Sequence, residues 1–343
     1  MNIRIFFLWL LDILGINALL SRLNRRKVLI LWYHGICDDS FTQLKGYDDR
    51  FITRSSFMKQ MEYLKNKSYN LITMTELINT IKNNGEFNKN VVLTFDDGLK
   101  NVIKNAYPIM QEYNAKGCLY VVSDNTGMDT LIWSDHVETL INSQKPGEFL
   151  FFFKGKKYTY ILSDMKSYEY AIKDIKKKLR SITNKEMQEH LKQFTQVEKE
   201  NLPEEYTLAS WDELKELDAE ILEIGSHTRT HPNCANLTDD VELENEILHS
   251  KEEIENIIGR KVEHFCYPAG SYNRRVLDEV KASGYQSAVT IEYGFIDKHA
   301  DLYRLKRVEA LASLPIFKSR VSGAYGILRA FSQIFRRRSF RIE

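Results

Sequence analysis

The stretch Val91-Val92-Leu93-Thr94-Phe95-Asp96-Asp97-Gly98 is an apolar run that ends in two adjacent carboxylates and a glycine. A run of this length, rich in β-branched residues, predicts a strand that is buried on both faces. Because side chains alternate along a strand, Asp96 and Asp97 should point in different directions from its end. One acid can then bind a metal ion while the other handles a proton.

The composition limits the class of protein. With 343 residues, of which 43 % are apolar, the chain can bury a substantial core and reaches the size of barrel folds with insertions. A net charge of +1 gives no general attraction to polyanions, so we expect no nucleic-acid partner. The cysteines lie far apart without a CxxC pair, which predicts reduced thiols in a cytosolic setting. They are Cys37, Cys118, Cys234 and Cys266.

The first segment, residues 1–27, predicts an apolar helix followed by basic residues. Ile5 to Leu20 is almost wholly apolar, but it contains Asp12 and Asn17 and is shorter than a bilayer span. A secretory signal carries its positive charges before the apolar run, whereas here they follow it, so we do not expect export. The helix should pack on the domain or lie in the membrane interface. We therefore expect a cytoplasmic protein and leave open a peripheral position on the inner face of the membrane.

The last segment, residues 311–343, predicts a basic amphipathic helix. From Lys318 to Glu343 the chain has seven basic residues and a single acid, with apolar residues between them at helical spacing. Such a helix can dock on an anionic membrane surface. The alternative is a solvated terminal helix whose apolar stripe covers the core. The sequence favours neither.

Between these segments, residues 28–310 alternate between strand-like and helix-like patterns. Strands are expected at Val28–Tyr33, Asn70–Ile72, Val91–Phe95, Cys118–Val122, Ile221–Ile224, His264–Tyr267, Gln286–Thr290 and Arg304–Val308. Helices are expected at Ser55–Lys67, Thr75–Lys82, Lys100–Tyr113, Asp239–Ile258 and Arg274–Ser283. This alternation predicts an α/β fold with a parallel sheet covered by helices, and about eight short strands favour a closed barrel. Catalytic groups of such barrels lie at the C-terminal ends of strands, as Asp96 and Asp97 do.

Residues 133–211 do not fit the alternation. Phe149–Tyr158 predicts a hairpin with a tight turn at Lys154-Gly155-Lys156, and helices are expected at Met165–Leu179 and Lys185–Lys199. We interpret this segment as an insertion between two barrel strands, on the catalytic face, where insertions often shape substrate access. A packing appendage is the alternative.

A second group of polar residues, Gly225-Ser226-His227-Thr228-Arg229-Thr230-His231-Pro232, follows the strand at Ile221–Ile224. Histidines four residues apart can bind one metal ion, although two solvated histidines are the commoner explanation. His227 falls just past a strand end, where Asp97 should project. The three residues would form a His₂Asp set with one open position, which is typical of catalytic metal sites. Cys234 is a further candidate ligand, with a buried thiol as the alternative.

This set predicts hydrolysis. A divalent metal lowers the pKa of its bound water and polarises a carbonyl oxygen. Asp96 can take the proton from the attacking water, and a histidine usually supplies the acid for the leaving group. Backbone N–H groups of the turn Tyr267-Pro268-Ala269-Gly270-Ser271-Tyr272 are suited to stabilise the oxyanion. An ordinary Pro-Gly loop is the alternative interpretation of that turn.

Three stretches together resemble the motifs of the polysaccharide deacetylases, the NodB-homology family or carbohydrate esterase family 4. They are Thr94-Phe95-Asp96-Asp97-Gly98, Ser226-His227-Thr228-Arg229-Thr230-His231 and Phe265-Cys266-Tyr267-Pro268-Ala269-Gly270-Ser271-Tyr272. Their order and spacing match the first three motifs of that family over residues 28–310, the insertion excepted. The resemblance implies a distorted (β/α) barrel that removes N- or O-acetyl groups from sugars, commonly N-acetylglucosamine units.

The resemblance also implies residue roles. Asp96 would be the general base, and Asp97, His227 and His231 would bind the metal. The stretch Leu31-Trp32-Tyr33-His34-Gly35 resembles the early motif of the subgroup that acts on poly-N-acetylglucosamine, which makes His34 the candidate acid. The metal would be Zn²⁺ first, with Co²⁺, Ni²⁺ or Fe²⁺ on similar terms.

The third motif departs from the family pattern. Its usual arginine, which braces the catalytic aspartate, is absent from Phe265-Cys266-Tyr267. Arg304 or Arg307 can substitute from a neighbouring strand, and surface arginines are the alternative. Tyr267, Ala269 and Tyr272 remain candidates for the substrate and oxyanion side of the site.

We therefore predict a metal-dependent deacetylase acting on an acetylated sugar, such as a unit of a surface polysaccharide or a glycolipid precursor. Hydrolysis of another small C–N substrate is the second hypothesis, because the same metal chemistry serves other amides. A non-catalytic glycan-binding member is the third, and the intact set of acids and histidines argues against it.

Overall fold

A closed ring of parallel strands forms the centre of the computed structural model, which describes residues 3–41, 50–127, 130–194 and 204–329. The ring order is β1-β12-β11-β10-β9-β6-β5, and it closes because β5 pairs with β1 as well as with β6. The bounds are β1 (Leu29–Tyr33), β5 (Asn90–Phe95), β6 (Gly117–Val121), β9 (Leu222–Ser226), β10 (His264–Cys266), β11 (Ser287–Tyr293) and β12 (Leu305–Glu309). The predicted α/β barrel is confirmed.

Each segment predicted as a strand is present, but one lies outside the ring. β4 (Asn70–Leu71) pairs only with the first two residues of β5. The structure also contains a parallel pair that the sequence analysis missed, β2 (Gly35–Cys37) and β3 (Phe51–Thr53). Both are three residues long, which is too short to show a pattern in the sequence.

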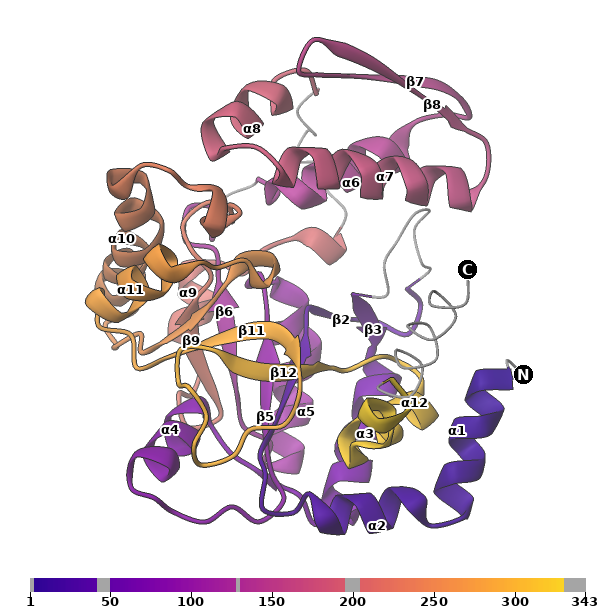
Figure 1. The fold of residues 1–343 in the computed structure, drawn as a ribbon, viewed down its shortest axis with the longest axis vertical. Coiled ribbons are helices and arrows are strands. Elements are labelled where there is room, and N and C mark those ends of the chain that lie inside the picture. Colours follow the sequence, from indigo (N-terminus) through magenta and orange to yellow (C-terminus); the bar gives the residue numbers. More distant parts are fainter. Residues whose placement is uncertain (1–2, 42–49, 128–129, 195–203, 330–343) are drawn as a thin grey trace, which may run out of the picture.

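Helices surround the ring, as Figure 1 shows. They are α3 (Arg54–Asn66), α4 (Met74–Lys82), α5 (Tyr107–Tyr113), α9 (Trp211–Lys215), α10 (Asp240–Ile258) and α11 (Arg274–Ala282). Short 3₁₀ turns are η3 (Glu204–Tyr206), η4 (Cys234–Asn236) and η5 (Pro268–Gly270). The helix expected from Lys100 begins instead with a π-helical turn, η1 (Val102–Ala106). Pro108 follows this turn and has no N–H to donate to the carbonyl four residues earlier, which accounts for the irregular first turn.

The strands are buried on both faces, as their apolar runs predict. Leu29 and Leu31 of β1 belong to the larger core cluster, between ring and helices, whereas Ile30 belongs to a smaller one on the inner face. The same alternation places Val92 and Cys118 in the inner cluster. Near the C-terminal ends of the strands, the ring interior holds the polar side chains of Thr94, Asp96 and Arg307.

The insertion forms a separate layer at the top of Figure 1. It comprises α6 (Trp133–Ser143), the antiparallel hairpin β7 (Gly147–Phe153) and β8 (Lys156–Leu162), α7 (Met165–Arg180) and α8 (Asn184–Leu191). Lys154 and Gly155 both have positive φ, which a two-residue hairpin turn requires. The predicted helix Lys185–Lys199 ends early, at Leu191, and Gln193 then bonds both backbone groups of Phe152. Residues 195–203 lie outside the described part.

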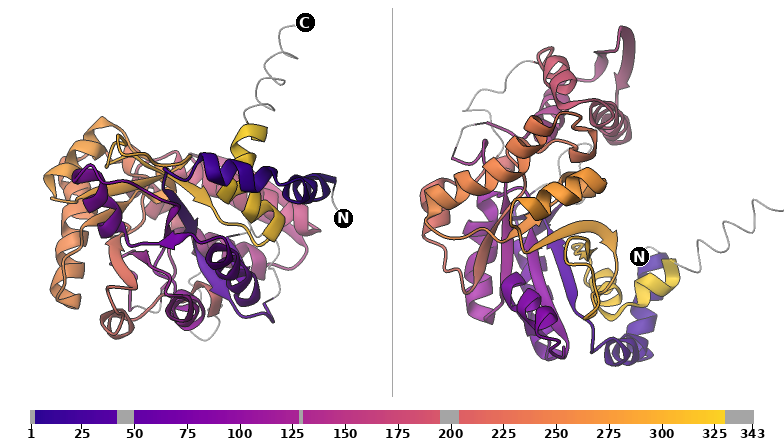
Figure 2. Two further views of the ribbon diagram at one scale, coloured as in Figure 1. Left: turned by 90° about the horizontal axis from the view of Figure 1, so that it is seen from below. Right: turned by 60° about the vertical axis from the view of Figure 1, so that its left-hand side comes forward.

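The N-terminal segment forms two helices rather than the predicted single one. Gly15, in the left-handed region at φ 73°, separates α1 (Ile3–Ile13) from α2 (Ile16–Leu23). Both contact α12 (Leu314–Ser322), and Figure 2 shows the indigo helices beside the yellow one in both views. The helix predicted for 311–343 breaks at Gly323, residues 324–329 are helical again, and 330–343 lie outside the described residues. None of the described helices has the length and apolarity to cross a membrane.

Candidate active site

The two adjacent carboxylates turn in different directions, as strand geometry predicts. Asp96 is the first residue after β5, and Asp97 and Gly98 follow in the left-handed region with φ of 77° and 78°. This bend is strained for an aspartate, and it turns the Asp97 carboxylate away from its neighbour. Both side chains are buried. Asp96 faces the ring interior, whereas Asp97 faces the histidines after β9.

Arg307 of β12 holds Asp96 through two hydrogen bonds. Its Nη1 donates to Oδ1 at 2.7 Å and its Nη2 donates to Oδ2 at 2.8 Å. The guanidinium is itself fixed, because its Nε donates to the Thr290 carbonyl at 2.8 Å. Burial alone raises the pKa of Asp96, but the Arg307 charge outweighs burial and holds that pKa well below its usual range. The carboxylate is therefore ionised and fixed in orientation.

The two arginines named from the sequence lie in different environments. Arg307 is completely buried against Asp96, whereas Arg304 is exposed and its Nε donates to Asp301 at 2.8 Å. Arg307, and not Arg304, therefore supports Asp96. Arg307 lies within β12 and points into the ring, whereas Arg304 lies in the bend just before β12.

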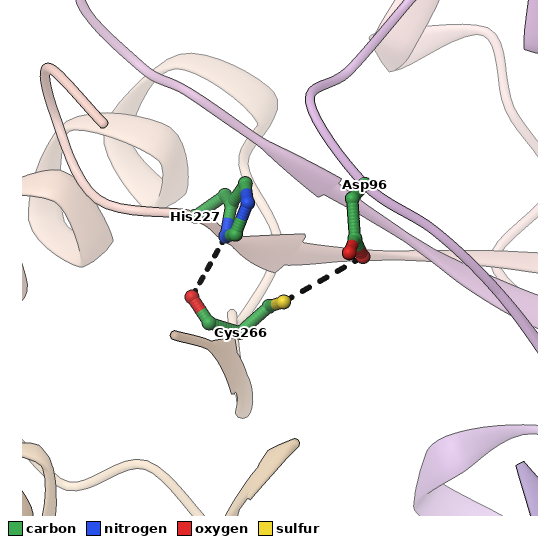
Figure 3. Close-up of side chains that lie close together, drawn as sticks. All are labelled: Asp96, His227 and Cys266. Atoms are coloured by element: carbon green, nitrogen blue, oxygen red, sulfur yellow. Dashed lines mark hydrogen bonds between the residues drawn. The ribbon is translucent and has the colours of Figure 1, made fainter. Parts of the chain in front are cut away.

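Cys266 lies where the family motif has its arginine, at the end of β10. Its Sγ is 3.5 Å from Asp96 Oδ1 and 3.3 Å from the Arg307 guanidinium. Its backbone carbonyl accepts a hydrogen bond from His227 Nδ1 at 2.7 Å, as Figure 3 shows. A short thiol at this position leaves room for the guanidinium that arrives from β12. Burial raises the pKa of the thiol well above its ordinary value, so Cys266 stays protonated.

Asp97, His227 and His231 form a candidate metal-binding group. The Nε2 atoms of His227 and His231 lie 3.6 Å and 3.7 Å from Asp97 Oδ1, and one ligand atom from each residue lies within 4.8 Å of the other two. Within the described residues, no donor makes a hydrogen bond to the Asp97 carboxylate, although it is buried. A buried carboxylate without donors is costly unless a cation balances it.

The protonation of the histidines also fits a cation. His227 donates through Nδ1 to the Cys266 carbonyl, and its Nε2 faces Asp97. Burial and the neighbouring His227 lower the pKa of His231 well below its ordinary value, so the imidazole is neutral. The Nδ1 of His231 is buried without a hydrogen-bond partner in the described part of the chain. The residues present therefore fit a divalent metal. Cys234 is buried away from this group, with its Sγ near the Pro232 carbonyl at 3.9 Å.

The turn that carries both histidines is held by Glu246 of α10. Its carboxylate accepts hydrogen bonds from the N–H groups of Arg229 and Thr230 at 3.0 Å and 2.9 Å, and from the Thr230 hydroxyl. These bonds fix a turn in which Thr228 and His231 both have positive φ. The sequence analysis missed Glu246 because it is one of many acids in α10, and nothing in the sequence marks it as the buried one.

His34 reaches the same site from the end of β1. Its Nε2 lies 3.9 Å from Asp97 Oδ2, whereas His227 and His231 face the other carboxylate oxygen, Oδ1. The side chain keeps 16 % of its surface accessible, so a substrate can reach it. The edge of its ring packs on Trp32, with the centroids 5.3 Å apart. The structure thus brings His34, Asp96, Asp97, His227 and His231 together.

The insertion contacts this site through α6. The indole N–H of Trp133 donates to the His231 carbonyl at 2.8 Å. Arg50, just before β3, lies 4.0 Å from Asp97 Oδ2 and binds Asp135 and Glu138 of α6 at 3.0 Å and 2.5 Å. These contacts place α6 at the catalytic end of the ring. Neither Arg50 nor Trp133 belongs to a motif, so neither could be predicted as part of the site.

The turn after β10 matches its predicted role only in part. The Tyr267 N–H donates to the Val289 carbonyl at 3.3 Å, so it is engaged between strands and not free for an oxyanion. The Tyr272 hydroxyl donates to Glu292 at 2.8 Å. Ala269, with φ 52° and ψ 18°, has an unusual backbone conformation that turns its peptide N–H out of any regular pairing. The substrate and oxyanion roles of these three residues stay predictions.

Comparisons with known proteins agree with this site. The family model described as "Polysaccharide deacetylase" matches residues 83–288, more than half of the chain. The Bacillus subtilis protein YxkH, assigned by name to the polysaccharide deacetylases, is 22 % identical over 302 residues, which cover 87 % of this chain and 76 % of that protein. A Staphylococcus aureus poly-β-1,6-N-acetyl-D-glucosamine N-deacetylase is 25 % identical over 164 residues, 42 % of this chain and 55 % of that enzyme.

Solved structures share the fold. The Streptococcus pyogenes deacetylase PplD, in complex with acetate, superposes with a TM-score of 0.56 at 19 % identity, over 86 % of this chain and 98 % of that one. IcaB from Ammonifex degensii gives a TM-score of 0.55 at 16 % identity, over 87 % of this chain and 96 % of that one. The ring and the motifs at its C-terminal edge define a hydrolase of the carbohydrate deacetylase class. This chain belongs to the polysaccharide deacetylase family.

Proposed function

We propose that this protein hydrolyses acetyl groups on a sugar of the N-acetylglucosamine type, with a divalent metal held by Asp97, His227 and His231. One observation carries the proposal. Within the described residues, no hydrogen-bond donor reaches the buried Asp97 carboxylate, which faces two histidines beside a second carboxylate that Arg307 keeps ionised. A purely structural role would not leave Asp97 in this condition, because buried polar groups are normally satisfied.

The bound metal would supply Lewis acidity, polarising the acetyl carbonyl and lowering the pKa of a water. Zn²⁺ suits the His₂Asp set, and Co²⁺, Ni²⁺ and Fe²⁺ are the other candidates. Asp96 accepts the proton of the attacking water at a carboxylate oxygen. Arg307 occupies one lone-pair direction of each oxygen and so restricts where that proton can arrive. The Ala269 N–H contributes to binding the oxyanion.

The leaving group receives its proton from His34. This residue lies across Asp97 from His227 and His231, so it can approach the sugar nitrogen or oxygen while Asp96 stays on the side of the water. A separate acid and base on two sides of the scissile bond is the arrangement that this hydrolysis needs. Trp32 and the accessible edge of the ring leave the Nε2 atom facing the site.

The sugar class rests on the relatives. The matched part of the S. aureus enzyme acts, by its name, on poly-β-1,6-N-acetyl-D-glucosamine. We therefore expect removal of N-acetyl groups from such units, in a surface polysaccharide or a glycolipid precursor, with O-acetyl groups as the second possibility. The chain spans about half of that relative, so the length and linkage of the substrate belong to the proposal as well.

Acetate release tests this proposal. The zinc-loaded protein should release acetate from β-1,6-linked N-acetylglucosamine oligomers, with chitooligosaccharides and O-acetylated sugars as comparison substrates. His34→Ala should lower kcat by roughly 10²- to 10⁴-fold without changing the metal content. His249→Ala, at an exposed histidine of α10, is the matched control and should keep full activity. Hydrolysis of small amides without acetate release from any sugar would favour the second hypothesis. Full activity in His34→Ala would show that His34 is not the proton donor for the leaving group.

A further inference from the structure

The outer face of the N-terminal helices carries a row of exposed apolar side chains. The outer face is defined by Phe6, Trp9, Ile13, Leu14, Leu19 and Leu23. Ile13 is 59 % exposed and Leu23 is 69 % exposed. Single exposed leucines are common on proteins, but six large apolar side chains exposed along two consecutive helices indicate an interaction surface.

The spacing on α1 shows that this row is one side of an amphipathic helix. Phe6, Trp9 and Ile13 recur at intervals of three and four residues and so share one face. Leu8 and Asp12 lie on the opposite side, where Leu8 is buried and Asp12 accepts a hydrogen bond from Lys318 of α12 at 2.7 Å. The inner side of α1 is therefore already occupied, whereas its outer side is exposed as far as the described residues show.

α2 continues the same arrangement. Asn17 is buried, and its Oδ1 accepts a hydrogen bond from the Ser322 hydroxyl of α12 at 2.9 Å. Leu19 and Leu23, four residues apart, face outward. Both helices are thus fixed to the domain by polar contacts on their inner sides. The apolar side chains of the outer face do not pack against α12 and remain exposed.

Four basic residues border this apolar row. Arg22 lies on the exposed side of α2, and Arg25, Arg26 and Lys27 follow it, all exposed. Within the described parts of the chain, no carboxylate forms an ion pair with any of them. No acid lies between Asp12 and Asp38 in the sequence. The local charge is therefore strongly positive, in contrast to the net charge of +1 for the whole chain.

We propose that the outer face docks on an anionic lipid bilayer. Apolar and aromatic side chains in one row, with uncompensated basic residues beside them, match a surface that is apolar within and negative at its headgroups. Tryptophan is favoured at this boundary, and Trp9 lies in the middle of the α1 row. A protein partner would not by itself account for four unpaired basic residues beside the row.

The fold keeps the candidate active site clear of this surface. α2 ends at Leu23, just before β1 begins at Leu29, so it lies at the N-terminal end of the ring. His34 and the acids lie at the other end, toward the insertion (Figure 1). Docking through the outer face therefore leaves the catalytic edge open to a substrate in water. The proposal does not depend on the proposed deacetylase activity.

Vesicle flotation of the full-length protein tests it. The wild type should float with vesicles of phosphatidylcholine mixed with phosphatidylglycerol, and much less with phosphatidylcholine alone. Binding should weaken as ionic strength rises, because the headgroup attraction is screened. Ile13→Glu should weaken binding roughly tenfold or more. The double variant Arg25→Glu/Arg26→Glu should weaken it roughly thirtyfold or more.

Matched controls exist in the insertion. Ile161 has the same 59 % exposure as Ile13 but lies on the hairpin, and Lys156 and Lys157 are an exposed basic pair beside it. Ile161→Glu and Lys156→Glu/Lys157→Glu should float like the wild type, and all variants should keep the wild-type circular dichroism spectrum. Brominated lipids should quench part of the tryptophan fluorescence in the wild type and not in Trp9→Phe.

Three outcomes would overturn the proposal. The first is a wild type that stays unbound with both vesicle compositions at low ionic strength. The second is a loss of binding in the insertion controls as large as in the outer-face variants. The third is a dimer in solution that Ile13→Glu dissociates, with no vesicle binding, because the outer face would then hold two copies of the chain together.

Discussion

Around β9 and β10, each end of the ring holds an acid and a histidine, and the two ends differ in one respect. At the N-terminal end lie Glu223 and His264, and at the C-terminal end lies His227, with Asp97 beside it. Glu223 accepts hydrogen bonds from the N–H groups at the start of α4, and both ring nitrogens of His264 have hydroxyl partners.

At the C-terminal end of the ring, by contrast, the described residues do not supply every polar atom with a hydrogen-bond partner. Among the described residues, the polar side-chain atoms that approach the Asp97 carboxylate are imidazole and guanidinium nitrogens, at 3.6 Å to 4.0 Å. The residue types at the two ends are nearly the same, so residue type does not distinguish a structural pair from a functional one. What distinguishes them is whether neighbouring elements supply partners for every polar atom.

The largest expected effect concerns Asp96, whose orientation Arg307 fixes. Asp96→Asn removes the base without changing the shape of the side chain, so kcat for acetate release should fall by roughly 10³-fold. Metal content should stay at the wild-type value, because Asp96 is not among the three ligands. Glu223→Gln, at the saturated end, should keep nearly full activity. Equal losses in both variants would erase the distinction between the two ends.

The second prediction compares the stability contributions of Arg307, in β12, and Arg304, in the loop just before it. Arg307→Met leaves the Asp96 carboxylate buried without its counter-charge, which should lower the free energy of unfolding by roughly 3–5 kcal/mol. Arg304→Met removes only an exposed pair with Asp301 and should change stability little. Urea unfolding of both variants measures the difference. Similar stability of the two would show that the buried pair contributes nothing.

The third effect concerns the carboxylate that holds the histidine turn. Glu246→Gln replaces an oxygen acceptor with an amide N–H₂ that faces the N–H groups of Arg229 and Thr230. The turn should then loosen, and zinc affinity measured by calorimetry should fall by roughly 10- to 100-fold. Glu244→Gln, at an exposed position of the same helix, is the control. An unchanged zinc affinity in Glu246→Gln would mean that the turn keeps its shape without this carboxylate.

The smallest expected effect is the pH dependence of stability that His264, at the N-terminal end of the ring, contributes. Burial, with Lys82 and Lys251, lowers the pKa of His264 from 6.5 to about 3. The unfolded chain therefore binds this proton first as pH falls below 6.5, and the folded protein loses roughly 1.4 kcal/mol per pH unit down to the folded pKa. His264→Gln should remove this part of the slope in urea unfolding between neutral pH and pH 5. His249→Gln, at an exposed histidine, should leave the slope unchanged.

Much of the ring could be predicted from the sequence, because apolar strands alternate with amphipathic helices and turn residues separate them. The residues after strand ends were also predictable, since Asp96, Asp97 and His227 follow apolar runs directly. Arg307 was one of two candidates, and only the register of β12 decides between them. Glu246 and Trp133 were not predictable, because each acts through a neighbour that is distant in the sequence.

Metal binding tests the central claim most directly. A calorimetric titration of the metal-free protein with zinc should show about one equivalent bound by the wild type and by Glu223→Gln. Asp97→Ala should bind zinc roughly 100-fold or more weakly, because it loses one of the three ligands. Equal zinc affinity in all three proteins would contradict the account, since the unsaturated carboxylate would then have no part in holding a metal.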